Sequence, residues 1–181
     1  MQLFGLVNNQ IASEIDDLVK GIVGTAVFRK DAARSKNPFP SSTDLEAAIK
    51  PWMLYNEFVH HPRLKHPATQ KGFEYDFFSE RLQIAVEVMG YRADDEIYKD
   101  ILKFHVHEGT RIGMVLVPRW KWLGLRKTST NFDATTKALS FANTFMDVDA
   151  LISVAYDWSS DGEGWRLALP DDAATSQSKM P

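Results

Sequence analysis

FEYDFFSERLQIAVEVM, residues 73–89, predicts a buried β-hairpin that carries two acids. Residues 82–89 are apolar and rich in β-branched side chains, which is typical of a buried strand. Residues 73–78 make a plausible partner strand, with the bend near residues 79–81. In such a hairpin Asp76 can lie beside Glu87, whose side chain shares a face with Ala85 and Met89.

Two carboxylates at the edge of a sheet repel each other and are costly to bury unless positive charge lies between them. A divalent metal ion supplies that charge, and hard oxygen ligands favour magnesium or manganese. Acids also occur on the solvated face of antiparallel hairpins, where they have no chemical role. Valine flanks Glu87 on both sides in the most apolar strand of the chain, which is an unusual position for an acid without a function.

Composition places the chain among ordinary globular proteins. It has 181 residues, 44% hydrophobic and 25% charged, which suits one domain with a substantial core. The net charge of −3 means that a nucleic acid would have to meet a local basic patch. Cysteine is absent, which excludes disulfides, thiolate zinc clusters and a thiol nucleophile. No apolar run approaches the length of a membrane span and no signal peptide is evident, so we expect a cytoplasmic protein without membrane partners.

The N-terminal third predicts two helices. Apolar residues recur at helical spacing over residues 9–28, and a second helix fits residues 44–59, capped by Ser42 or Thr43. Polar loops at residues 29–43 and 60–72 follow these helices.

After the hairpin the pattern alternates between helix and strand. A helix from residue 94 ends near Gly109, a strand covers 111–117, a helix covers 133–146 and a strand covers 149–157. The two helical crossovers predict parallel neighbours. Residues 164–170 suggest an edge strand, and residues 171–181 suggest a loose tail. We therefore expect one α/β domain over residues 1–170, with a helical part at 1–60, a core at 70–157 and a central mixed sheet flanked by helices.

This order and its acids resemble the PD-(D/E)XK restriction-endonuclease-like superfamily over about residues 70–157. In that family an acid on one strand precedes an apolar strand with the triplet (D/E)-X-K. Asp76 matches the first acid, and Glu87-Val88-Met89 matches the triplet. The run IAVEVMGYRADDEIYKDILKFHVHEGTRIGMVLVPR is similar to type II restriction enzymes in which the triplet lysine is replaced. The resemblance implies that Asp76, Glu87 and the carbonyl of Val88 hold Mg²⁺ or Mn²⁺.

Met89 departs from the family pattern, because a thioether neither takes a proton nor binds a hard metal well. Some family members place the lysine on the following helix, where Lys99 and Lys103 share a face. The family also often adds an acid from an N-terminal helix, for which Glu57 is the candidate. Glu74 shares a face with Asp76 in an ideal strand and is an alternative metal ligand. The simpler interpretation is that these lysines and Glu57 lie on solvated helix surfaces and have no catalytic role.

Two basic segments are candidates for nucleic-acid binding. Residues 119–127 interleave cations with tryptophans, which suits phosphate neutralisation and stacking, although the indoles could equally pack beneath the loop. The loop at residues 60–72 is a second basic stretch. The candidate contacts are Arg119, Lys121, Arg126, Lys127, Arg63, Lys65 and Lys71. A zinc site made by His60, His61 and His66 competes with the more usual reading of such histidines as surface residues.

The leading hypothesis is a restriction-enzyme-like endonuclease that hydrolyses phosphodiester bonds in DNA with Mg²⁺ or Mn²⁺, a deoxyribonuclease. Double-stranded DNA is the expected partner, and the family suggests a homodimer because cutting a duplex needs two sites. A degenerate nuclease fold that binds DNA or a protein without cleavage is the second hypothesis. The third is an unrelated α/β interaction protein whose acids lie idle on its surface.

Overall fold

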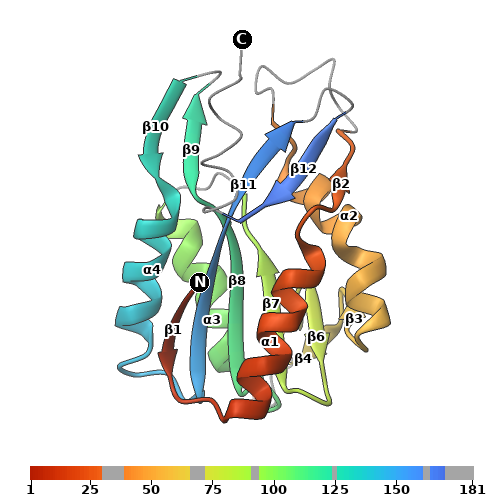
Figure 1. Ribbon diagram of the computed structural model, residues 1–181. Coiled ribbons are helices and arrows are strands. Elements are labelled where there is room, and N and C mark those ends of the chain that lie inside the picture. The colour runs from red at the N-terminus through yellow and green to blue at the C-terminus, as the bar shows by residue number, and fades with distance from the viewer. Residues whose placement is uncertain (30–38, 66–71, 91–93, 124–125, 161–163, 170–181) are drawn as a thin grey trace.

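A mixed β-sheet with helices on both faces forms the protein (Figure 1). The computed structural model describes residues 1–29, 39–65, 72–90, 94–123, 126–160 and 164–169. In spatial order the main sheet contains β2 (Ala26–Val27), β12 (Trp165–Ala168), β11 (Ala150–Ser160), β8 (Ile112–Pro118), β7 (Ile84–Val88), β6 (Phe77–Ser79) and β3 (Val59–His60). Strand β1 (Gln2–Gly5) also pairs with β11.

The parallel centre of the sheet confirms the predicted crossovers. Strands β7 and β8 are parallel, as are β8 and β11, and β6 lies antiparallel to β7. Helix α3 (Asp94–Val106) connects β7 to β8, and α4 (Asn131–Ala142) lies between β8 and β11 in the sequence. The three central strands are buried almost throughout, as their near-continuous apolar sequences predict.

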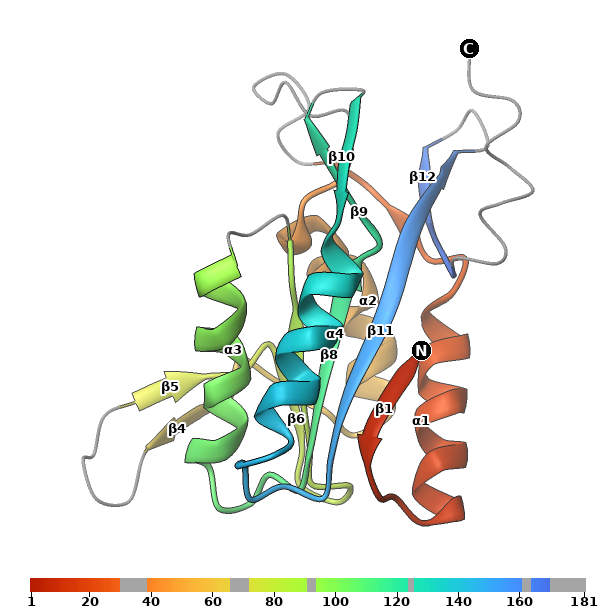
Figure 2. The same ribbon diagram turned by 90° about the vertical axis from the view of Figure 1, so that its left-hand side faces the viewer.

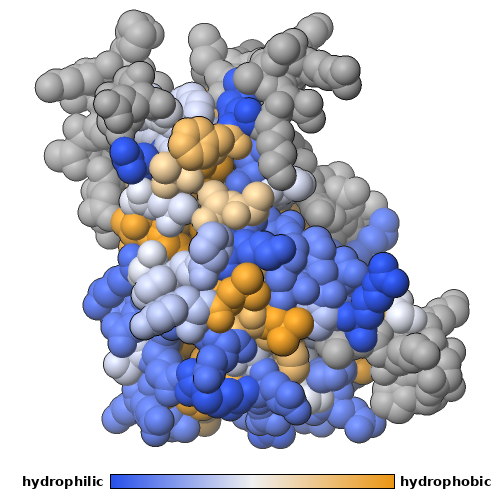
Figure 3. Space-filling model, turned by 90° about the vertical axis from the view of Figure 1, so that its right-hand side faces the viewer, coloured by the Kyte–Doolittle hydropathy of each residue, from blue (hydrophilic) through white to orange (hydrophobic). Residues whose placement is uncertain are grey.

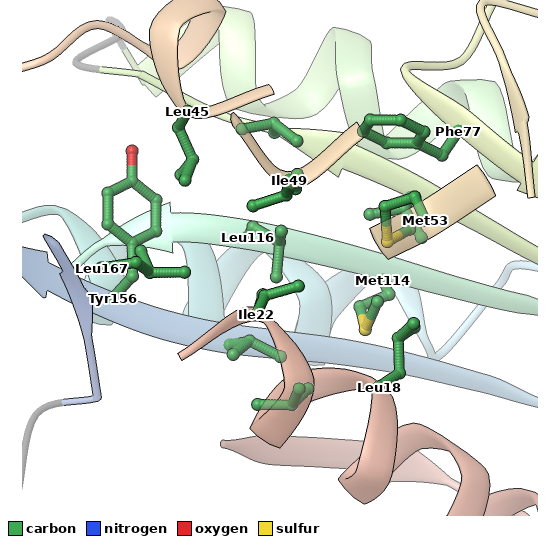
Figure 4. Packing of buried hydrophobic residues seen from close by; sticks show 14 of the residues in the cluster. Leu18, Ile22, Leu45, Ile49, Met53, Phe77, Met114, Leu116, Tyr156 and Leu167 are labelled. Carbon is green, nitrogen blue, oxygen red and sulfur yellow. The ribbon is translucent and has the colours of Figure 1, made fainter. Parts of the chain in front are cut away.

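Each face of the sheet has its own apolar cluster. Helices α1 (Asn9–Ile22) and α2 (Ser42–Tyr55) cover one face, and α3 and α4 cover the other (Figure 2). Under α1 and α2, side chains such as Ile22 and Ile49 reach Met114 and Leu116 of β8 (Figure 4). Alternate residues of β7 divide between the two clusters, because successive side chains of a strand point to opposite faces.

The two N-terminal helices are shorter than predicted and begin at different caps. Helix α1 ends at Ile22, and its N-terminus is capped by Asn8, whose side chain accepts a hydrogen bond from the Ile11 amide. Ser41 caps α2 in a reciprocal capping box with Asp44, so Ser42 and Thr43 lie inside the helix. Helix α2 ends at Tyr55 rather than near residue 59.

Several strands were missed because they are short or polar. The predicted loop at 60–72 contains β4 (Arg63–Lys65), which pairs with β5 (Gly72–Glu74), and the basic segment at 119–127 contains β9 (Trp120–Leu123), which pairs with β10 (Arg126–Thr130). Strand β12 is not at the edge, because the two-residue β2 pairs along its outer side. The predicted tail at 171–181 lies outside the described residues.

The surface over α2 is mainly hydrophilic, with small groups of apolar side chains between the polar ones (Figure 3). None of the described helices combines the length and apolar character needed to cross a membrane.

Truncating the core under α2 should destabilise the protein strongly. Ile49 is fully buried between α2 and the sheet, so Ile49→Ala should lower the free energy of unfolding by about 2–5 kcal/mol. Leu54 lies on the same helix and is 48% exposed, so Leu54→Ala should change it by less than about 1 kcal/mol. Urea denaturation of both variants measures the difference, and equal losses would contradict the observed packing of α2.

Candidate active site

Asp76 lies at a break in the predicted strand, immediately before β6. The hairpin partner expected at 73–78 is divided into β5 and β6, which pair with different strands. Asp76 Oδ2 accepts a hydrogen bond of 2.6 Å from the Val88 amide on β7. Because Phe77 pairs with Val86, this bond places Asp76 beside Glu87, as the sequence predicts.

Glu87 is buried in the sheet, with only 3% of its surface exposed. Val86 and Val88 belong to the cluster under α1 and α2, whereas Glu87 projects to the opposite face, toward α3. Its Oε2 accepts a hydrogen bond of 2.8 Å from Lys103 Nζ. Its Oε1 is buried and has no hydrogen-bond partner among the described residues, which is a costly arrangement for a carboxylate oxygen.

Lys103 is the lysine that the fold brings to the acids. Its ammonium lies 2.8 Å from Glu87 and 3.0 Å from Asp100 Oδ1, one turn earlier on α3. Burial would lower the pKa of Lys103, but the carboxylates of Glu87 and Asp100 outweigh that effect and raise the pKa. Lys103 therefore stays charged at neutral pH. Lys99 is exposed on the same helix.

The acids carry more negative charge than one ammonium balances. Burial, followed by repulsion from Asp76, raises the pKa of Glu87 from its ordinary value of 4.5 to about 8. Burial also raises the pKa of Asp76, and the nearby Glu46 adds to this effect, although the hydrogen bond from Val88 opposes it. At neutral pH the site without a further cation therefore retains a proton on Glu87.

Tyr75 joins helix α3 to the segment that carries Asp76. Its hydroxyl donates a hydrogen bond of 2.7 Å to the backbone oxygen of Lys103 and lies 3.1 Å from the Thr110 hydroxyl. Its ring is fully buried and stacks against the rings of Phe78 and Phe104. Tyr75 thus holds the backbone of Lys103, the residue that contacts Glu87. The position of Lys103 therefore depends on the segment that carries Asp76.

Glu46, rather than Glu57, is the acid from the N-terminal helices that approaches Asp76. Glu57 lies beyond the end of α2, in a turn with a positive φ of 63°, and its carboxylate pairs with Arg81 at 2.7 Å. Glu46 lies on the first half of α2 and is close enough to influence the pKa of Asp76. Glu74 pairs with His61 at 3.5 Å and with Arg63 at 3.6 Å, and the strand breaks between Glu74 and Asp76.

The candidate DNA contacts lie in several parts of the structure. Arg63 is on β4 and is 91% exposed, and the guanidinium carbon of Arg119 lies 5.3 Å from the ring centroid of Trp120. Lys65 is on β4, Lys121 on β9, and Arg126 and Lys127 on β10, but their side chains lie outside the description, as does Lys71 altogether. The β9–β10 pair projects beyond the helices at the end of the sheet where β8 and β11 finish (Figures 1 and 2).

Sequence reasoning did not identify Glu46, Tyr75 or Asp100. Asp100 had a visible signal, since it lies three residues before Lys103 and could share its helix face. Glu46 had no signal of its own, because acids are common on the polar faces of helices.

Comparison with known proteins identifies the family. Residues 7–156 match the model of the family described as "Putative halobacteria restriction endonuclease". The chain belongs to this family. Its structure is similar to the crystal structure of restriction endonuclease BglII complexed with a DNA 16-mer, with a TM-score of 0.53, 12% identity, and coverage of 91% of this chain and 87% of that one. No curated protein matched the sequence.

Membership of this restriction-endonuclease family and the BglII-like arrangement confirm the predicted fold class, an α/β fold with a mixed sheet flanked by helices. Enzymes of this fold generally use divalent metal ions. The residues of this chain fit one. Asp76 and Glu87 offer hard oxygen ligands, Glu87 Oε1 has no hydrogen-bond partner in the described part of the chain, and the raised pKa of Glu87 indicates a deficit of positive charge.

The ionisation of Glu87 should make the metal-free protein less stable as the pH rises. Because the pKa of Glu87 is raised to about 8 in the folded state, the folded protein binds more protons than the unfolded chain between about pH 4.5 and 8. The free energy of unfolding should therefore fall across this window. Glu87→Gln, which cannot ionise, should flatten the dependence in urea denaturation with EDTA present.

Glu80→Gln is the matched control, because Glu80 is an exposed acid in the turn between β6 and β7. It should retain the wild-type pH profile. A wild-type protein whose stability rises between pH 4.5 and 8, with the same slope in Glu87→Gln, would contradict the assignment of a proton to Glu87.

Proposed function

We propose that this protein is a metal-dependent endonuclease that hydrolyses phosphodiester bonds in double-stranded DNA. The observation that carries the proposal is the pairing of the half-buried Asp76 with the buried Glu87, whose carboxylate lies 2.8 Å from the Lys103 ammonium, in a chain of a restriction-endonuclease family. In this assignment Asp76, Glu87 and the Val88 carbonyl hold Mg²⁺ or Mn²⁺. Such an ion would polarise the phosphate and favour ionisation of a water molecule.

Other residues of the chain would supply the charge stabilisation and the positioning that hydrolysis also requires. Lys103 would offset the negative charge that develops on the phosphoryl oxygens, and its raised pKa keeps it protonated for that role. Asp100 orients the ammonium from 3.0 Å, and Tyr75 fixes the backbone that carries it. Lys103 thus takes the part of the lysine that Met89 replaces in the triplet.

Binding to DNA is supported by the family and by the basic strands. Strands β9 and β10 carry Lys121, Arg126 and Lys127 on a pair that projects from the sheet. Cations on such a projection could follow the phosphate backbone, which would make affinity strongly salt-dependent. A homodimer would supply the second site that cleavage of both strands requires.

A DNA-binding protein without cleavage is the second candidate. Met89 favours it, because this side chain is 1% exposed and packs in the apolar cluster under α3 and α4, where it offers no polar group to a phosphate. Salt-dependent retention of DNA without metal-dependent nicking would support this candidate.

Plasmid nicking in the presence of Mg²⁺ or Mn²⁺ tests the nuclease directly. Asp76→Ala and Glu87→Ala should abolish it, because each removes a carboxylate ligand. Lys103→Ala should lower the rate by about 10²–10⁴-fold, as the loss of a catalytic proton-transfer or charge-stabilising group does. Lys99→Ala should lower the rate of nicking much less, because Lys99 is exposed on the same helix.

Lys20→Ala, an exposed lysine of α1 that pairs with Asp16, serves as the matched control and should nick at the wild-type rate. Nicking that survives both Asp76→Ala and Glu87→Ala would refute the assignment of the site. Far-ultraviolet circular dichroism of each variant checks that the fold is retained.

Binding of Mg²⁺ or Mn²⁺ should release a proton from Glu87. A cation lowers the pKa of the carboxylate that holds it, and the pKa of Glu87 without the metal is raised to about 8. Titration calorimetry at pH 7 in buffers of different ionisation enthalpy should therefore show nearly one proton released per ion. Glu87→Gln should release none, and a wild-type heat that is independent of the buffer would contradict the prediction.

A further inference from the structure

His60, His61 and Glu46 form a second cluster beside Asp76. Nε2 of His60 and Nε2 of His61 each lie 2.6 Å from the same oxygen, Oε1 of Glu46. The three potential ligand atoms all lie within 4.8 Å of one another, and within the described part of the chain this is the one group of three or more such side chains to do so. The zinc site suggested by the sequence included His66, which lies outside the described residues; Glu46 supplies the third group here.

The backbone at His61 is what turns both rings to the same side. Successive residues of a strand point to opposite faces, so a histidine that continued β3 beyond His60 would normally point away from it. His61 follows the strand with a positive φ of 50°, in the left-handed region that few non-glycine residues adopt, although histidine does so more readily than most. The two rings consequently stack at 3.8 Å with an interplanar angle of 19°. Strained backbone of this kind clusters at functional sites, where it positions side chains.

The far side of His61 has the partner that metal-bound histidines commonly have. Its Nδ1 lies 3.5 Å from Oε1 of Glu74, while its Nε2 faces Glu46. A carboxylate at the second ring nitrogen fixes the tautomer and the orientation of a metal-ligating histidine. Glu74 lies at that distance from β5, a strand that does not belong to the main sheet.

Without an ion, the ring nitrogens of both histidines face the same carboxylate oxygen of Glu46. A single divalent cation bound by the two ring nitrogens and the carboxylate satisfies all three groups with both rings neutral.

We propose that Glu46, His60 and His61 form a binding site for a divalent transition metal ion of the zinc class, separate from the magnesium site at Asp76 and Glu87. Imidazole nitrogens favour zinc or cobalt over magnesium, which prefers oxygen ligands. Two histidines and one glutamate are a recurrent zinc ligand set that leaves a coordination position open. This site does not depend on cleavage of DNA.

The ion would hold Asp76 in place. The His61 amide donates a hydrogen bond of 3.0 Å to the Asp76 backbone oxygen, and His60 pairs with Phe77 across β3 and β6. Glu46 belongs to α2, so the ion would join that helix to the segment that carries Asp76. The site is therefore a positioning element for the candidate active site.

Titration of the metal-free protein with Co²⁺ and Zn²⁺ tests the proposal. Co²⁺ should bind with the visible absorption of a nitrogen-ligated ion, Zn²⁺ should displace it, and Zn²⁺ should raise the melting temperature. Glu46→Gln and His61→Asn should each weaken binding by at least about tenfold. Asparagine tolerates a positive φ, so His61→Asn removes the ligand while preserving the backbone.

Two controls separate this site from the others. His105→Asn replaces an exposed histidine of α3 and should bind Co²⁺ like the wild type. Glu87→Gln removes the magnesium-site carboxylate and should leave the cobalt spectrum unchanged, whatever its effect on nicking. Circular dichroism of the metal-free variants verifies folding. Absence of Zn²⁺ binding, or equal binding by wild type, Glu46→Gln and His61→Asn, would overturn the proposal.

Discussion

Repulsion between buried carboxylates is the constraint on which the centre of this structure depends. Glu87 and Asp100 pair with a single ammonium, that of Lys103, and Asp76 lies beside Glu87, at the boundary between the sheet and α3. Low-dielectric surroundings strengthen such repulsion and deprive the charges of water. A fold selected only for stability would place apolar residues there. The buried acids lower the stability of the protein locally, and their negative charge favours the binding of a cation.

The architecture brings these charges together through two features of the chain. The break before β6 leaves Asp76 free to accept the Val88 amide, so the acid takes a place that a ladder hydrogen bond would otherwise fill. The parallel pairing of β7 with β8 requires a crossover, and that crossover is α3, which delivers Lys103 to Glu87. The site therefore follows from the topology rather than from a local motif alone.

The sequence predicted the parts of this arrangement that rest on local patterns. An acid between valines in an apolar strand identified Glu87, and alternation of helix and strand predicted the parallel centre. It could not distinguish Lys103 from Lys99, because both share a helix face and only tertiary packing decides which ammonium reaches Glu87. It selected Glu57 instead of Glu46, because the end of α2 at Tyr55 depends on a turn with positive φ that no residue type announced. Strand β12 was assigned to the edge because its partner, β2, has only two residues.

In the proposed site, Lys103 of α3 supplies the ammonium that Met89 does not. Met89 follows β7 and packs in the apolar cluster with Ile97 and Ile101 of α3, so an ammonium on that side chain would have to be buried among them. Lys103 approaches from the helix, and its ammonium reaches Glu87 at 2.8 Å. The apolar thioether of Met89 fills this part of the core without burying a second charge in it.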